Sequence, residues 1–145
     1  MKTKKQKPVY SINLEDIPEQ ISDSEVLTYL QTKNIDWNYL NNIKKITDFN
    51  DEVISNWLNV SVKTYRSYRL PNNKFKDNVK EQIILLLSVV RHGISVFGTA
   101  KEFNQWLNSK NFYFDYKIPN AYLNTVTGIR FVEDRLTAIE YGDNV

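Results

Sequence analysis

The chain has 145 residues, of which 41% are hydrophobic and 13% aromatic, and its formal net charge is +2. This length suits one compact domain, or two small ones that share a core. It contains no cysteine, which excludes disulfides and thiolate metal sites. The longest apolar stretch, residues 83–90, amounts to about two helical turns, too short for a membrane span. The start, MKTKKQKPVY, carries charge but no apolar core, unlike a secretory signal. We therefore expect a cytoplasmic protein without a membrane partner.

The charge is unevenly distributed along the chain. Residues 61–80 contain six lysines and arginines and a single acid, Asp77. From Glu133 onward there are four acids and a single base, Arg135. A basic middle and an acidic tail suggest two different partners.

Glycine and proline are scarce, and the apolar residues recur with helical spacing, which favours an all-α protein. The Lys-rich residues 1–21 are predicted to form a disordered arm. Helices are then expected over 23–33 with Ser22 as N-cap, over 37–45, over 51–58, in a basic segment capped by Ser61, and over 77–96.

Gly98 is expected to end the long helix in a left-handed conformation. Thr99 and Glu102 have the spacing of a capping box that starts the next helix. The segment NSKNFYFDYKIPN has no clean period and is predicted to be an ordered aromatic loop. Pro119 suits the first turn of a short helix, and Asn124 is predicted to cap the last helix.

The middle of the chain has the pattern of a helix-turn-helix. Asn59 would occupy the turn in a left-handed conformation, and Tyr65 would face inward. The outward positions carry residue types that contact phosphates and base edges. The candidate DNA-binding residues are Ser61, Lys63, Thr64, Arg66, Ser67, Arg69 and Lys74. The alternative is a helical hairpin with a basic, solvated face.

Catalytic chemistry has little support in this sequence. The single histidine, His92, lies near a helix end, and there is no Gly-rich phosphate loop. The adjacent acids Glu133 and Asp134 would point to different faces of a helix. We expect no enzymatic activity, no cofactor and no metal.

The C-terminal third carries a family resemblance. The stretches VFGTAKEFNQWLNSKN, IPNAYLNTVTG and VEDRLTAIEYG resemble the toxin-binding domain of Xre/MbcA/ParS-type antitoxins. The matching features are Val96-Phe97-Gly98, Trp106-Leu107, Pro119 with Tyr122-Leu123, Gly128, Val132-Glu133, Leu136 and Ile139-Glu140-Tyr141-Gly142. Residues 50–90 are similar, more weakly, to the Xre-like helix-turn-helix of that family. The chain departs from the pattern at NFYFDYKI, which replaces a small, Gly-containing loop.

The resemblance implies an all-α protein with a helix-turn-helix region at 22–92, which binds DNA and dimerises, and a small helical toxin-binding domain at 93–145. It implies an antitoxin of a type II system that pairs with a RES-domain toxin, an NAD-degrading enzyme. The C-terminal segment would cover the toxin's active site, and a homodimer, as the family likeness suggests, would bind its own promoter. The implied toxin-binding residues are Pro119, Tyr122, Arg130, Arg135, Ile139, Glu140, Tyr141, Gly142, Asp143, Asn144 and Val145.

Two competing functions stay open at the level of sequence. One is a free-standing helix-turn-helix transcriptional regulator without a toxin partner. The other is an adaptor that binds a different protein.

Overall fold

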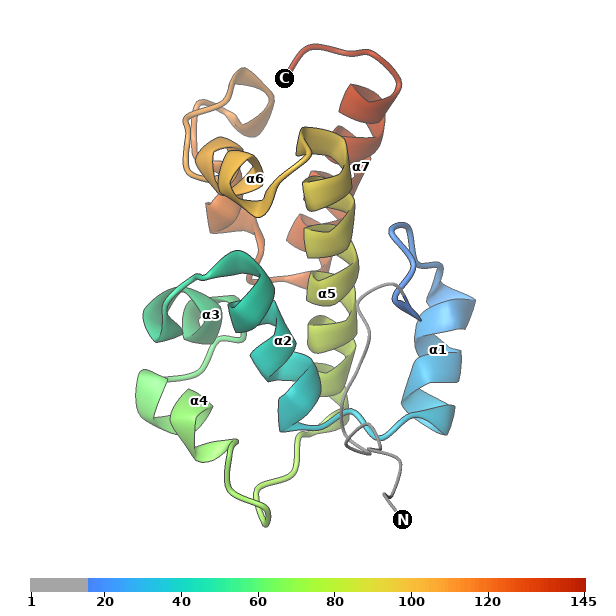
Figure 1. Cartoon of the computed structure of the whole chain (residues 1–145), viewed down its shortest axis with the longest axis vertical. Coiled ribbons are helices and arrows are strands. Elements are labelled where there is room, and N and C mark those ends of the chain that lie inside the picture. Colours follow the sequence, from blue (N-terminus) through green and yellow to red (C-terminus); the bar gives the residue numbers. More distant parts are fainter. Residues whose placement is uncertain (1–15) are drawn as a thin grey trace, which may run out of the picture.

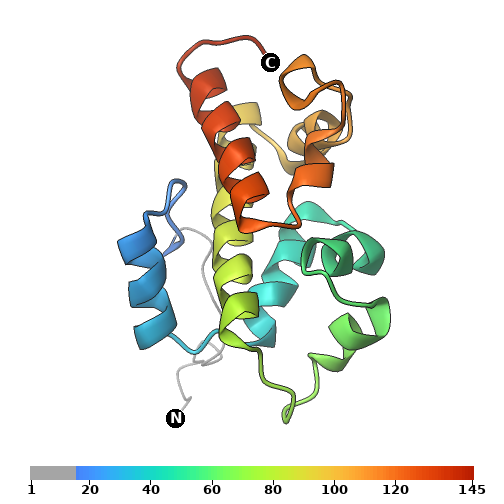
Figure 2. The ribbon, with the colours of Figure 1, turned by 180° about the vertical axis from the view of Figure 1, so that it is seen from behind.

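Helix α5 (Asp77–Phe97) is the central element of the computed structural model, which describes residues 16–145. Helices α1, α2, α6 and α7 all pack against it, and Figures 1 and 2 show it at the centre of the molecule. Every residue from Ile83 to Val90 is buried, because this stretch is apolar on all sides apart from Ser88. Full burial of a large aliphatic side chain is worth about 1.5–3 kcal/mol. The cover around α5 therefore supplies much of the stability of the fold.

The N-terminal half forms α1 (Asp23–Thr32), α2 (Trp37–Thr47), α3 (Asp51–Trp57) and α4 (Val62–Ser67). The predicted N-caps of α1 and α4 are confirmed, since Ser22 accepts from the Glu25 amide and Ser61 from the Thr64 amide. The basic helix is shorter than predicted. The prediction extended it to Arg69, but it ends at Ser67, so Arg69 lies after it rather than on it.

The C-terminal half forms α6 (Ala100–Leu107), the 3₁₀ turns η2 (Phe112–Phe114) and η3 (Pro119–Tyr122), and α7 (Val126–Glu140). Thr99 caps α6 as predicted, although only its side of the capping box is formed, with the Glu102 amide as donor. The prediction for α7 was wrong by one residue. Thr125, in an extended conformation, accepts from the Gly128 amide at 2.9 Å, and Asn124 lies outside the cap.

A sharp corner joins α5 to α6. Gly98 has a φ of +92°, which confirms the predicted left-handed end of α5. At Gly93 the two helices approach so closely that a Cβ would lie 2.2 Å from Cε1 of Phe103. Within residues 16–145, no single helix is long and apolar enough to cross a membrane; α5 and α6 meet that test only together, across a bend of 106°.

The two regions predicted from the sequence share one core. Helix α5 runs without a break through the proposed boundary at residues 92–93, and the buried apolar residues form a single cluster. Ile17 and Ile21 belong to that cluster, being 1% and 4% exposed. Residues 16–21, which the sequence prediction placed in a disordered arm, are thus packed on the core because these two isoleucines are buried there. Residues 1–15 of the predicted arm lie outside the described residues.

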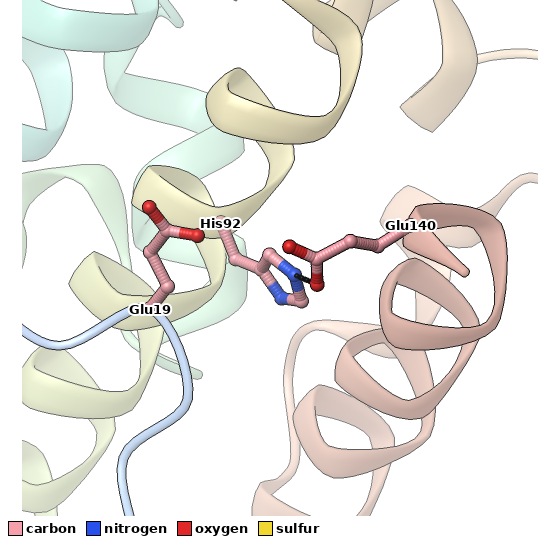
Figure 3. A group of neighbouring side chains, drawn as sticks. All are labelled: Glu19, His92 and Glu140. Carbon is pink, nitrogen blue, oxygen red and sulfur yellow. Dashed lines mark hydrogen bonds and ion pairs between the residues drawn. The ribbon is translucent and has the colours of Figure 1, made fainter.

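An ionic joint centred on His92 fastens α7 to α5. The imidazole is fully buried, and its two nitrogens contact carboxylates of α7: Nδ1 that of Glu133, and Nε2 that of Glu140 at 2.9 Å. Figure 3 shows His92 reaching from α5 toward Glu140, with Glu19 on its other side. Burial lowers the pKa of His92, but the two carboxylates outweigh it, and the net shift of the pKa is upward.

The joint should make the stability of the protein depend on pH. Because folding raises the pKa of His92, its contribution is fully present below the unfolded pKa of about 6.5 and is lost as the pH rises through the folded pKa. The free energy of unfolding should fall by about 1.4 kcal/mol for each unit by which folding raises that pKa. Urea denaturation at about pH 6 and about pH 9 measures the loss.

The matched control is His92→Gln, which retains a donor for one carboxylate but does not titrate. Its stability should change less over the same pH interval. Parallel pH profiles for the two proteins would contradict the assignment of the titration to His92.

Candidate functional site

Helices α3 and α4 form a helix-turn-helix pair. Asn59 has a φ of +58°, which confirms its predicted left-handed conformation in the turn. Trp57 and Tyr65 are buried at 0% and 1% exposure, so the inner faces of both helices are committed to the core. The remaining face of α4 is turned to solvent.

The predicted DNA-binding residues fall into two groups. Those with exposed side chains are Ser61, Lys63, Thr64, Arg66, Arg69 and Lys74, whereas Ser67 is half-buried. Ser61 is occupied as the N-cap of α4, and Ser67 accepts from the side chain of Asn73 at 2.7 Å. These two hydroxyls therefore serve the local fold.

Arg66 is held in place by a carboxylate. Its Nε donates to Oδ2 of Asp51 at 2.8 Å, and Nζ of Lys44 donates to Oδ1 of the same side chain at 2.5 Å. The hydrogen bonds from Lys44 and from Arg66 lower the pKa of Asp51, so the carboxylate is ionised at neutral pH. The two ion pairs of Asp51 join α4 to α2 and α3, and they leave more than half of the Arg66 side chain exposed.

Several of the predicted toxin-binding residues are engaged within the chain. Pro119 is buried, and Tyr122 donates from its hydroxyl to the carbonyl of Phe114 at 3.0 Å. Arg130 donates to the carbonyl of Ile21 at 2.8 Å and to the carboxylate of Asp23 at 2.6 Å.

Ile139 and Glu140 are also engaged. The side chain of Ile139 packs on the core, and Glu140 contacts His92. Sequence reasoning did not foresee the contact of Glu140, because His92 lies far away in the sequence, on α5.

Residues 141–145 are all exposed, as a partner-binding segment requires. After α7 the chain reverses at Gly142, whose φ is +101°, and the amide of Asp143 donates to the carbonyl of Ala138 at 3.0 Å. The segment then arches back toward α6, as Figure 1 shows. Trp106 and Asn111 donate from their side chains to the carbonyl of Val145, at 3.4 and 3.2 Å. The terminal segment is thus a loop with Tyr141 and Gly142 at its start, not a free strand.

Arg135 is the residue that fixes this loop. Its guanidinium carbon lies 3.5 Å from the ring centroid of Tyr113, a cation–π contact. One terminal nitrogen donates to the carbonyl of Asn144 and pairs with the carboxylate of Asp143 at 3.1 Å. Only 11% of the side chain is exposed. Arg135 therefore acts within the chain as a positioning residue for the tail.

The described residues offer one group with the donor types of a cation site. Glu19, His92 and Glu140 can each direct one ligand atom to a common region, with all three atoms within 4.8 Å of one another. All three already have partners, since Arg91 donates to Glu19 at 3.1 Å and Gln20 donates to Glu140 at 3.4 Å. The arrangement fits an ionic joint between elements.

Side-chain hydrogen bonds connect α2 and the helix-turn-helix to the C-terminal part. Nε1 of Trp57 donates to the side chain of Asn120 at 2.5 Å, and the amide of Asn59 donates to the carbonyl of Asn124 at 2.7 Å. In the reverse direction, the side-chain amide of Asn104 on α6 donates to the carbonyl of Thr47 on α2 at 2.7 Å. The two candidate surfaces, basic α4 and the C-terminal loop, consequently belong to one body.

Comparison with known proteins bears on the C-terminal surface. A search of curated proteins found no match. Residues 92–142 match the family model described as the antitoxin Xre/MbcA/ParS C-terminal toxin-binding domain. The match begins at His92 on α5, includes α6, both 3₁₀ turns and α7, and ends at Gly142 in the terminal loop. This family is not a family of enzymes, and its members take a toxin as partner. Residues 92–142 are thus similar to the toxin-binding domain of Xre/MbcA/ParS-type antitoxins.

Proposed function

We propose that the protein neutralises a RES-domain toxin, an NAD-degrading enzyme, by covering its active site with the C-terminal loop. The observation that carries this proposal is the match of residues 92–142 to a toxin-binding domain that ends in an exposed loop. The RES partner is what the sequence resemblance implies. Within the proposal the protein is a cytoplasmic antitoxin without catalytic activity of its own.

Inhibition of this kind requires binding but no chemistry. A segment that is already ordered loses less conformational entropy when it binds, so its affinity is higher. The Arg135 contacts with Tyr113, Asp143 and Asn144 supply that order. Tyr141, with 82% of its surface exposed, offers an amphipathic ring at the start of the loop. The carboxylate of Asp143, which is 47% exposed beside Arg135, suits a cleft whose arginines or lysines bind the phosphates of NAD.

The second part of the proposal is repression of the protein's own operon through DNA binding by a homodimer. The exposed Lys63, Thr64 and Arg66 on α4 support it, because lysine and arginine neutralise phosphates. The competing function is a transcriptional regulator without a toxin. The match to a toxin-binding domain favours the antitoxin.

Replacement of Tyr141 by alanine should weaken toxin binding without affecting the fold. The ring makes no contact that the core depends on, and truncation of a buried interface tyrosine costs about 2 kcal/mol, or about thirtyfold in Kd. Isothermal titration with a RES-domain toxin measures the change. Growth of cells that co-express the two proteins gives the functional counterpart.

The control for this experiment is Lys45→Ala, an equally simple truncation of an exposed side chain on α2. It should protect cells as the parent protein does. If Tyr141→Ala and a chain that ends at Glu140 both protect fully, the loop does not cover the toxin's active site.

Replacement of Lys63 by alanine should weaken promoter binding and reduce its dependence on salt. Each phosphate contact that is lost lowers the slope of log K against log salt by about 0.9. Arg66→Ala should do the same and should also release Asp51 from one of its two ion pairs. Fluorescence anisotropy with a promoter fragment at several salt concentrations gives the slope.

Lys101→Ala, on the exposed side of α6, is the matched charge control and should leave the slope unchanged. An identical slope for Lys63→Ala, Arg66→Ala and the parent protein would mean that the basic face of α4 is simply solvated.

A further inference from the structure

The turn between α6 and η3 has an unfavourable backbone conformation. Asp115 and Tyr116 follow one another with φ values of +55° and +61°. Aspartate tolerates this left-handed region, but a bulky side chain such as tyrosine rarely adopts it. The turn is nevertheless well tied, because the Asn111 carbonyl accepts from the amides of Phe114 and Tyr116, and the Asn111 amide donates to Lys117. Such conformations persist where surrounding contacts enforce them, and they are concentrated at functional sites.

Two aromatic layers result from this conformation. The inner layer anchors the turn: Phe114 is 1% exposed and lies against Trp106, with ring centroids 5.8 Å apart. The outer layer is Phe112 and Tyr116, which are 67% and 65% exposed and have centroids 5.7 Å apart in an edge-to-face arrangement. The outer pair contributes little to the core, yet the strained turn holds it in place.

A hollow next to the outer pair extends this surface toward the terminal loop. It has a volume of about 630 Å³, and its apolar lining comprises Phe97, Trp106, Phe112, Tyr113 and Val145. Tyr113 also carries the cation–π contact with Arg135, which in turn holds the loop. The outer pair, the hollow and the terminal loop are therefore continuous.

Two other sides of residues 92–142 contact the rest of this chain. Asn104 and Asn120 hydrogen-bond to residues of α2 and α3, and Arg130 bonds to Ile21 and Asp23. These hydrogen bonds to α2, to α3 and to the segment leading into α1 do not involve Phe112, Tyr116 or residues 141–145.

We propose that Phe112 and Tyr116 are a docking surface for the toxin, where they enter an apolar pocket on it beside the cleft covered by the loop. This inference rests on the proposed antitoxin function and assigns it a second contact. The pair suits a protein partner because aromatic side chains that enter a pocket dominate the affinity of protein interfaces. The hydroxyl of Tyr116 would lie at the rim, where a polar group stays hydrated.

The test uses the full chain with Phe112→Ser and Tyr116→Asn combined. Asparagine accepts the left-handed conformation, so the second substitution removes the ring while the turn keeps its shape. The matched control is Leu27→Ser with Leu70→Ser, a pair that is 57% and 62% exposed in the N-terminal half. Binding to a RES-domain toxin is measured by isothermal titration, with promoter binding and the thermal midpoint as checks on the fold.

The Phe112/Tyr116 variant should bind the toxin at least a hundredfold more weakly, with promoter binding and the midpoint unchanged, while the control binds as the parent does. If the parent binds the toxin and the variant binds within about threefold of it, the docking surface is refuted and the antitoxin function stands. If the parent itself does not bind, the antitoxin function fails. If toxin affinity is kept but sedimentation shows that the variant has lost a dimer, the pair joins two copies of this chain and the proposal is overturned.

Discussion

The burial of α5 is the constraint on which the rest of the structure depends. The stretch 83–90 of α5 is apolar around the helix apart from Ser88, so it has no face to turn to water and must be covered from every side. Helices α1, α2, α6 and α7 provide that cover. The N-terminal and C-terminal halves of the chain both contribute, and neither could bury the helix alone. The fold is therefore a single core built from two sequence regions.

This shared core has a mechanical consequence for the two candidate surfaces. The basic helix α4 is tied to α2 and α3 through Asp51, and α3 is tied to η3 through Trp57 and Asn120. A change at the C-terminal surface would be transmitted through packed helices rather than through a flexible linker. The arrangement gives any coupling between DNA and toxin a physical route, although the size of a coupling free energy depends on differential contacts in each state.

Local features of the fold could be predicted from the sequence, and long-range ones could not. Helix ends depend on residues within one turn of each other, so neighbouring residues in the sequence are enough to predict them. This applies to the caps at Ser22, Ser61 and Thr99 and to the left-handed Gly98. The burial of Ile17 and the partners of Arg130 depend on residues far along the chain. The cap of α7 was missed because Asn124 and Thr125 are both good N-cap types, and the preceding turn decides between them.

The candidate site illustrates the same limit at Arg135. From the sequence it is a basic residue in an acidic tail, which suggests an exposed group that meets a partner. In the structure its guanidinium stacks on Tyr113 and holds Asp143 and Asn144, so its charge is used inside the chain. The ring that receives it comes from the aromatic turn at which the sequence departs from the family pattern. The bulky turn and the fixed terminal loop thus depend on the same contact. The ring of Tyr113 provides the surface against which Arg135 packs, and Arg135 orders the loop.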